Sequence, residues 1–319
     1  MGVKYLNKYL VTNCKNDIVL THMCECKNKI LVVDISIYMY KFQMSDSLID
    51  NMYIMLNLFE KYDIIPVFIF DGKPPPEKRK MIDKRYLDRI NAETEYNDLC
   101  KKVNDNNISA EDKRMLTNEL NLLKRKCVYI SKHDIEKVQE LIYAYGYSYC
   151  VAPSEADELC ATFVKCGYAW ACVSEDMDMF VYGVPRVLRY LSLINNTFVL
   201  YDTHSILNTL SITQNELRYL CILSGTDYDI ENDNNINNVF DLFYKYKDSK
   251  CKIELYDWLK NKEEVKLPEK DIIKDIYDMF CKTSSKCEVI VKNYKQDNNV
   301  KNTDKIKKIL EEDGFIYPN

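Results

Sequence analysis

Two stretches decide the fold: Ile-Leu-Val-Val-Asp at residues 30–34 and Ile-Pro-Val-Phe-Ile-Phe-Asp at residues 65–71. Each is a short continuous apolar run that ends in an acid, which is typical of a parallel strand buried on both faces. Between them, apolar residues recur at helical spacing from Leu48 to Phe59. Strand, helix and strand in this order predict a right-handed parallel crossover. We therefore expect an α/β fold with a doubly wound, mostly parallel sheet.

The same alternation continues through the middle of the chain. We expect a strand at 148–151, a helix at 154–166, a strand at 169–173, a hairpin at 186–190 and 198–201, and a helix at 213–223. Beyond residue 228 the sequence is rich in Asn and Lys, with several short amphipathic segments. This pattern predicts a core over residues 1–228 and a helical C-terminal subdomain over residues 229–319.

Residues 76–132 interrupt this alternation. Charged helical sequence runs from the Pro-rich stretch at 72–76 to about residue 99, an Asn-rich turn follows at 104–107, and a second charged helix covers 109–126. Residues 72–132 hold 15 Lys or Arg against 10 Asp or Glu, although the whole chain has a net charge of −5. A basic segment on an acidic body suits a protein that binds a polyanion with one part and cations with another. A solvated charged helix is the alternative.

The composition places the chain among globular proteins of reducing compartments. It has 319 residues, of which 47% are hydrophobic and 29% are charged, close to the globular average. No apolar stretch approaches the roughly 18 residues that a membrane span needs, and residues 1–10 lack the apolar core of a signal peptide. The 13 cysteines are an odd number, which argues against a complete disulfide framework. We expect an intracellular protein that is neither secreted nor bound to a membrane.

Acidic residues gather where the predicted strands end. In an open parallel sheet, ligands bind outside the carboxyl ends of the strands. Seven carboxylates are expected to share this edge: Asp34, Asp71, Glu155, Asp157, Asp176, Asp178 and Asp227. Without cations they would repel one another, and an all-oxygen site without His favours Mg²⁺ or Mn²⁺. Taken singly, each acid has an ordinary alternative, since Ser154 and Asp157 fit a helix capping box and the others suit strand ends or turns.

Six segments resemble one known family in order and in spacing. They read Met-Gly-Val-Lys-Tyr-Leu at 1–6, Val-Val-Asp-Ile-Ser-Ile-Tyr-Met-Tyr at 32–40, Pro-Val-Phe-Ile-Phe-Asp-Gly-Lys-Pro-Pro at 66–75, Ala-Pro-Ser-Glu-Ala-Asp at 152–157, Ser-Glu-Asp-Met-Asp at 174–178 and Leu-Ser-Gly-Thr-Asp-Tyr at 223–228. The family is that of the flap endonucleases and the wider xeroderma pigmentosum group G 5′-nucleases. The resemblance extends through residue 228.

The resemblance implies a PIN-like nuclease core with a helical arch over about residues 76–132. It implies a structure-specific 5′ flap endonuclease or 5′–3′ exonuclease that hydrolyses DNA phosphodiesters in replication, repair or recombination. The seven carboxylates would then ligate two Mg²⁺ ions, with Mn²⁺ as a substitute. Lys78 and Arg85 match the family's catalytic cations, which neutralise the reacting phosphate. Seven residues apart on a helix, they share one face two turns apart.

Further DNA contacts follow from the same resemblance. Tyr40 matches an aromatic residue that stacks on a base near the cleaved bond, and packing in the core is its alternative. Gly2 matches an N-terminus that lies close to the site, where extra bulk or preceding residues would interfere. The basic DNA contacts that the resemblance implies are Lys84, Arg89, Lys124, Arg125 and Lys126. Plain solvation is the alternative for each of these basic side chains.

The chain departs from the family after residue 228. The family's helix-turn-helix element has a Gly-x-Gly turn with basic residues, whereas residues 229–238 contain no Gly, Lys or Arg. We expect at most a degenerate element there, and its contact with duplex DNA and with K⁺ is left open. The family's sliding-clamp peptide is not recognisable.

The expected partner is branched or 5′-flapped DNA, bound by a monomer in the nucleus or at a cytoplasmic site of DNA replication. A catalytically weak or silent DNA-binding scaffold and a single-strand ribonuclease of the same sheet architecture are the alternative functions.

Overall fold

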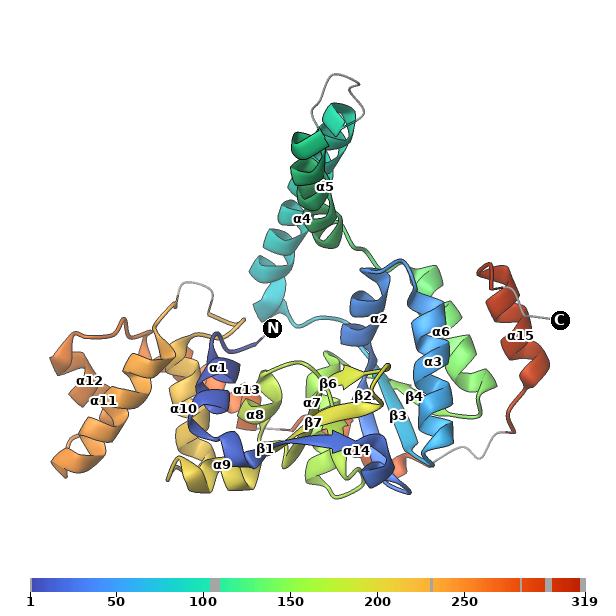
Figure 1. The fold of residues 1–319 in the computed structure, drawn as a ribbon. Coiled ribbons are helices and arrows are strands. Elements are labelled where there is room, and N and C mark those ends of the chain that lie inside the picture. The colour runs from blue at the N-terminus through green and yellow to red at the C-terminus, as the bar shows by residue number, and fades with distance from the viewer. Residues whose placement is uncertain (1, 104–109, 230–231, 282, 296–299, 316–319) are drawn as a thin grey trace.

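The computed structural model describes residues 2–103, 110–229, 232–281, 283–295 and 300–315. Its centre is a seven-stranded sheet in the order β1-β7-β6-β5-β2-β3-β4 (Figure 1). The strands are β1 (Ile18–His22), β2 (Ile30–Asp34), β3 (Ile65–Phe70), β4 (Ser148–Val151), β5 (Ala171–Val173), β6 (Arg186–Ser192) and β7 (Thr197–Asp202). Strands β2 to β6 run parallel to one another, and β7 pairs antiparallel with β6 and β1. The expected doubly wound, mostly parallel sheet is confirmed.

Helices cover both faces of the sheet. Along β2, Val32 belongs to one hydrophobic cluster, whereas Leu31 and Val33 belong to the other. This two-sided burial is the reason why β2 is a continuous apolar run. The cluster on the first face includes buried side chains of α1 (Leu6–Asn13), α7 (Ala156–Lys165), α8 (Asp178–Tyr182), α9 (Thr203–Thr209), α10 (Gln214–Ser224), α11 (Ile236–Ser249), α12 (Leu255–Lys262), α13 (Lys270–Cys281) and α14 (Ser285–Asn293). The cluster on the second face includes buried side chains of α2 (Ile35–Gln43), α3 (Leu48–Lys61), α6 (Lys132–Ala144) and α15 (Thr303–Glu312).

The basic insertion forms a pair of helices that projects from the body of the molecule (Figure 1). Helices α4 (Arg79–Val103) and α5 (Ala110–Lys126) pack on each other through a small cluster of their own. Its buried members are Ala92, Leu99 and Leu123. We call this pair the arch. The Asn-rich turn expected at 104–107 lies outside the described residues.

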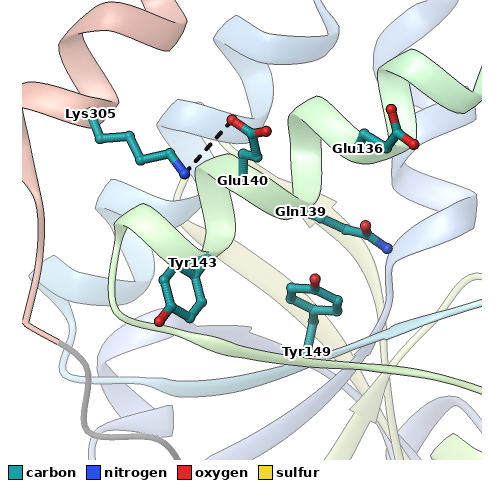
Figure 2. A pocket seen from close by; sticks show the side chains of 6 residues that line it. All are labelled: Glu136, Gln139, Glu140, Tyr143, Tyr149 and Lys305. Atoms are coloured by element: carbon teal, nitrogen blue, oxygen red, sulfur yellow. Dashed lines mark ion pairs between the residues drawn. The ribbon is translucent and has the colours of Figure 1, made fainter.

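The helices after residue 228 pack directly on the core. Helices α11 to α14 add buried side chains to the cluster on the first face, and α15 returns to the second face beside α6. The Asn302 N–H donates to the Ala144 carbonyl at 2.7 Å, and Lys305 Nζ lies 3.7 Å from Glu140 Oε2 across a small surface pocket (Figure 2). The division of the chain at residue 228 stays a prediction.

Several elements lie where none was expected, among them α1, α2, α8, α9 and β1. Residues 35–43 form helix α2, so Tyr40 lies on a helix that begins directly after β2. Strand β1 pairs with β7 and forms one edge of the sheet. All 13 cysteines are free thiols, and each lies in the described part of the chain. Among the described helices, none has the length and apolarity needed to span a membrane.

Candidate functional site

Parallel strands bring the predicted carboxylates to one edge of the sheet. Asp34 ends β2 and Asp71 follows β3, its neighbour in the sheet. Asp176 and Asp178 follow β5, which pairs with β2 on the other side. The remaining three acids lie on the helices that begin or end at this edge: Glu155 and Asp157 at the start of α7, and Asp227 after α10. The structure therefore brings the predicted ligands together.

Burial and crowding raise the pKa of three of these acids well above its usual range. For Asp34, burial is the main cause, followed by the charges of Asp71 and Asp176. Burial likewise raises the pKa of Asp157 and of Asp178, and the charge of Asp176 adds to both. One carboxylate oxygen, Asp178 Oδ1, is buried with no hydrogen-bond partner among the described residues. The charge of Lys78 partly offsets this rise for Asp157 and Asp178, and further cations at this edge would favour the ionised forms.

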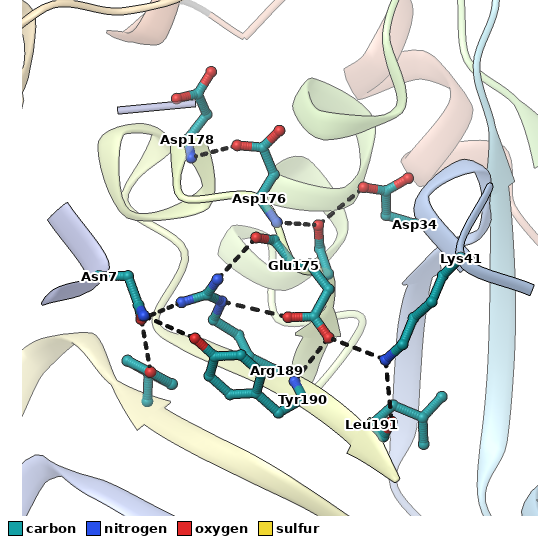
Figure 3. A network of polar contacts seen from close by, with 11 residues as sticks. Asn7, Asp34, Lys41, Glu175, Asp176, Asp178, Arg189, Tyr190 and Leu191 are labelled. Carbon is teal, nitrogen blue, oxygen red and sulfur yellow. Dashed lines mark hydrogen bonds and ion pairs between the residues drawn. The ribbon is translucent and has the colours of Figure 1, made fainter. Parts of the chain in front are cut away.

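A chain of hydrogen bonds fixes the loop at 174–178 (Figure 3). The Ser174 hydroxyl donates to Asp34 Oδ2 at 2.9 Å and accepts the Asp176 N–H at 3.1 Å. The Asp178 N–H donates to Asp176 Oδ1 at 2.9 Å. The carboxylates after β5 are thereby held in register with the carboxylate that ends β2.

A buried arginine on β6 supports the loop at 174–178, and no sequence motif had indicated it. Arg189 on β6 is only 5% exposed. Its guanidinium donates to the Glu175 carbonyl at 3.0 Å and to Asn7 Oδ1 on α1, and its Nε lies 3.8 Å from Glu175 Oε2 (Figure 3). Lys41 on α2 also approaches Glu175, at 3.9 Å. A charged residue between the apolar residues Leu188 and Leu191 of β6 is the signal that could have revealed this support.

Two cations face the carboxylates from the beginning of the arch. Lys78 ends a short 3-10 turn, Pro76–Lys78, directly before α4, and Arg85 lies in α4, so the two do not share the one continuous α-helix that was expected. Lys78 Nζ lies 2.8 Å from Glu155 Oε1, and Arg85 Nη2 lies 2.9 Å from Asp227 Oδ2. Burial lowers the pKa of Lys78, but the charges of Glu155, Asp157 and Asp178 outweigh it and raise that pKa to about 12. The two predicted catalytic cations therefore lie at the carboxylate edge.

Tyr228 organises the contact between Lys78 and Glu155, and it too was missed. Its hydroxyl donates to Glu155 Oε2 at 3.0 Å, and the Lys78 ammonium lies 4.6 Å from the centre of its ring. The ring packs edge-on against Phe280 of α13. The Asp-Tyr pair that ends the family resemblance was the available signal, because only its aspartate was assigned a role.

The other predicted DNA contacts lie at the edge or on the arch. Gly2 has a φ of +74°, and a Cβ at this position would come within 2.4 Å of Asp176 Oδ1 and of Asp178 Oδ1. Tyr40 on α2 is 45% exposed. The remaining predicted contacts are on the arch: Lys84, Arg125 and Lys126 are exposed, Lys124 pairs with Asp46, and Arg89 lies beside Tyr86 and Tyr129. Their roles in DNA binding stay predictions.

The Asn-rich segment after residue 228 has a structural role. The Asn232 amide donates to the Ile222 and Leu223 carbonyls at 3.2 Å each, and the Asn234 amide donates to the Leu223 carbonyl at 2.7 Å. These contacts satisfy carbonyls that the end of α10 leaves without helical partners. Residues 230–231 of the expected turn lie outside the described part, so its contact with DNA or K⁺ stays open.

The donor set fits a divalent cation, although it is not closed around one. Within the described ranges, no group of three or more His, Cys, Asp or Glu side chains is arranged so that it could hold a metal ion. The acids are nevertheless all-oxygen donors with raised pKa values, and Asp178 contributes a buried oxygen without a partner. Mg²⁺ and Mn²⁺ prefer such donors.

We expect Mg²⁺ to stabilise the protein more strongly as pH rises. A buried acid with a raised pKa contributes stability that is complete below its unfolded pKa, about 4, and is lost as pH rises through its folded pKa. In EDTA, the charges on Asp34, Asp157 and Asp178 should therefore lower the Tm with increasing pH, and bound cations should offset that loss. Thermal unfolding with EDTA or Mg²⁺ across a pH series tests this. An Mg²⁺-induced rise in Tm that is the same at acidic and alkaline pH would contradict it.

Comparison with known proteins identifies the family. The model of the XPG N-terminal domain matches residues 1–92, and the model of the XPG I-region matches residues 146–227, so together they cover more than half of the chain. The chain belongs to the XPG and flap endonuclease family. The two matched regions of this XPG-family chain contain all seven carboxylates, Lys78 and Arg85, and they leave out α5 and every helix after residue 228.

Individual relatives agree with this assignment. Flap endonuclease 1 of Glycine max is 33% identical over 168 residues, which are 52% of this chain and 41% of that protein. The XPG-family chain thus spans less than half the length of this relative. Flap endonuclease-1 from Methanococcus jannaschii has a similar fold, with a TM-score of 0.65 at 22% identity over 94% of this chain and 91% of that one. The catalytic core of Rad2 in complex with a DNA substrate gives a TM-score of 0.69 at 18% identity over 98% and 96%.

Proposed function

We propose that this protein is a structure-specific 5′-nuclease that hydrolyses phosphodiesters in branched or 5′-flapped DNA with the help of divalent cations. The observation that carries the proposal is the convergence of seven carboxylates at one edge of the sheet, with Lys78 and Arg85 paired to two of them. Family membership and the flap endonuclease relatives support it. Structural neighbours that were solved with DNA support the class of substrate.

Each part of the cluster has a task in this proposal. Asp34, Asp71, Glu155, Asp157, Asp176, Asp178 and Asp227 would hold two Mg²⁺ ions. When bound, such ions lower the pKa of a water molecule and neutralise charge on the reacting phosphate and the departing 3′ oxygen. Ser174 keeps Asp34 and Asp176 in register, and Arg189 holds the backbone of the loop at Glu175. No nucleophilic side chain is required.

Lys78 acts as a fixed cation rather than as a base. With a pKa of about 12 it stays protonated at neutral pH, and the Tyr228 ring and Glu155 hold its ammonium group in place. It can stabilise negative charge that develops on the phosphate. Arg85 is about half exposed, so its guanidinium can exchange Asp227 for a phosphate oxygen without crossing the protein interior.

The substrate test is a single gel experiment. Flap, nicked, gapped, bubble and blunt DNA, together with matched RNA, are incubated with the protein in Mg²⁺ or in EDTA. The proposal predicts Mg²⁺-dependent cleavage of DNA at or near a 5′ junction. Cleavage of RNA alone would favour the ribonuclease alternative, and binding without cleavage of any substrate would favour a DNA-binding scaffold. The same preparation, run by size-exclusion chromatography, tests the expected monomer.

A further inference from the structure

Three side chains form a stack at the base of the arch. Arg89 on α4 places its guanidinium carbon 5.4 Å from the ring centre of Tyr86 and 4.7 Å from that of Tyr129. Tyr129 belongs to the segment between α5 and α6, so the stack joins α4 to the part of the chain that follows α5. Tyr86 is 55% exposed and Tyr129 is 59% exposed. Each ring therefore contacts the guanidinium while most of the residue remains open to solvent.

The guanidinium of Arg89 has an N–H group that donates no hydrogen bond to a described residue. Its Nε is buried without a hydrogen-bond partner in the described part of the chain, and the nearby carboxylate oxygen, Glu93 Oε1, lies 3.6 Å away. An unsatisfied buried donor is costly unless a ligand or water completes it. A stack that served only to pack the arch would be expected to satisfy this group internally.

The stack is continuous with the carboxylate edge through Tyr40 and Arg85. Burial raises the pKa of Tyr40, the charge of Asp71 raises it further, and the charges of Arg89 and Arg85 lower it. Arg85 and Arg89 are one turn apart on α4 and share a face, and Arg85 reaches Asp227. A single DNA strand that leaves the carboxylate edge along this face of α4 would therefore reach the stack.

The same part of α4 exposes apolar surface where a solvated helix would carry polar groups. Ile82, Tyr86 and Ile90 recur every fourth residue and are 39%, 55% and 36% exposed. Basic residues flank this stripe, including Lys80 and Lys84. Apolar and aromatic faces beside cations suit unpaired nucleotides, whose bases stack on rings while their phosphates contact Lys and Arg. An acidic or neutral protein helix would match the stripe but would leave the guanidinium and its neighbouring rings without a specific role.

We propose that Tyr129, Arg89 and Tyr86 form a stacking platform for unpaired bases of the single-stranded arm of the DNA substrate. The proposal rests on the function proposed above for the nature of the substrate. It assigns the bases to the two rings and the phosphates to Arg89 and its basic neighbours. Recognition of this kind depends on the presence of a base and tolerates any sequence.

The test separates contacts with bases from contacts with phosphates. Two flap DNAs are compared in Ca²⁺: one carries 2-aminopurine in its single-stranded arm, and the other has an abasic arm with the same phosphates. The wild type should bind the base-bearing arm about tenfold more tightly and quench its fluorescence, as expected for one or two stacked bases. Tyr86→Ala combined with Tyr129→Ala should bind both arms equally and lose the quenching. Tyr129→Phe should behave as the wild type.

Tyr143→Ala is the matched control. Tyr143 is an exposed tyrosine, at 53%, that lines the pocket between α6 and α15 (Figure 2), and its loss should change neither binding nor quenching. Equal affinity of the wild type for both arms, or equal weakening of both arms in the double variant, would overturn the platform. Cleavage by a protein that binds both arms equally would refute the platform and leave the proposed function standing. Base-dependent binding without cleavage of any substrate would support the platform and refute the nuclease.

Discussion

Asp176→Asn together with Asp178→Asn should abolish cleavage of flap DNA and leave the affinity of the protein for flap DNA intact. The two acids share the loop after β5, and Asp178 Oδ1 is buried without a partner within the described residues. Removing both charges takes away cation ligands and also relieves repulsion toward phosphate. Because the cations supply several kcal/mol of transition-state stabilisation, we expect a loss of roughly a thousandfold or more in the single-turnover rate.

The fold should survive this double substitution. Asparagine has the shape of aspartate, and its Oδ1 can still accept the Asp178 backbone N–H that Asp176 Oδ1 accepts now. The hydrogen bond from the Asp176 N–H to Ser174 is also retained. Asp248→Asn, at an exposed position on α11, is the control and should cleave normally. Single-turnover cleavage and equilibrium binding are measured on the same preparations. A double variant that cleaves at the wild-type rate would show that the loop at 174–178 does not hold the catalytic cations.

Lys78→Ala should slow the chemical step about a hundredfold to a thousandfold with little change in DNA affinity. Its ammonium is buried between Glu155 and the Tyr228 ring, so its charge acts mainly on the reacting phosphate. Lys124→Ala is the contrast, because Lys124 lies at the exposed return of the arch beside Asp46. That variant should bind more weakly and show a flatter dependence of affinity on salt.

Single-turnover rates and affinities across a salt series distinguish the two lysines. Similar losses of affinity and rate in both variants would mean that Lys78 is only part of a diffuse basic surface. Thermal unfolding of Lys78→Ala provides the folding control, because the substitution leaves Glu155 without its ion-pair partner. The Tyr228 hydroxyl remains available to that carboxylate.

The strands of the core were predictable because their signal is local. Residues 30–34 and 65–70 are apolar on both faces, and each is followed or ended by an acid. Helix α2 was not predictable from its sequence, Ile-Ser-Ile-Tyr-Met-Tyr, whose β-branched and aromatic residues favour strands. It is helical because Ile35, Tyr38 and Met39 can then enter the same hydrophobic cluster. Strand β1 depends on pairing with β7 about 180 residues away, and a local pattern carries no trace of that contact.

The candidate site could likewise be predicted only in part from the sequence. The carboxylates and Lys78 could be placed from motifs, because parallel topology alone collects the residues at strand ends. The residues that hold these side chains in place could not be predicted from motifs. Arg189 contacts Asn7, which lies 182 residues away in the sequence, and Tyr228 contacts Glu155, which lies 73 residues away. The Asn-rich segment shows the reverse case, because its composition suggested a weakened DNA contact and its described amides cap α10 instead.

The return of α15 to α6 has a consequence for synthesis on the ribosome. Ile306, Ile309 and Leu310 of α15 belong to the hydrophobic cluster on the second face of the sheet, where α15 packs beside α6. This side of α6 stays exposed until α15 has left the exit tunnel, long after the strands have been translated. We expect stalled nascent chains that lack α15 to be cut rapidly by protease and those that include it to resist.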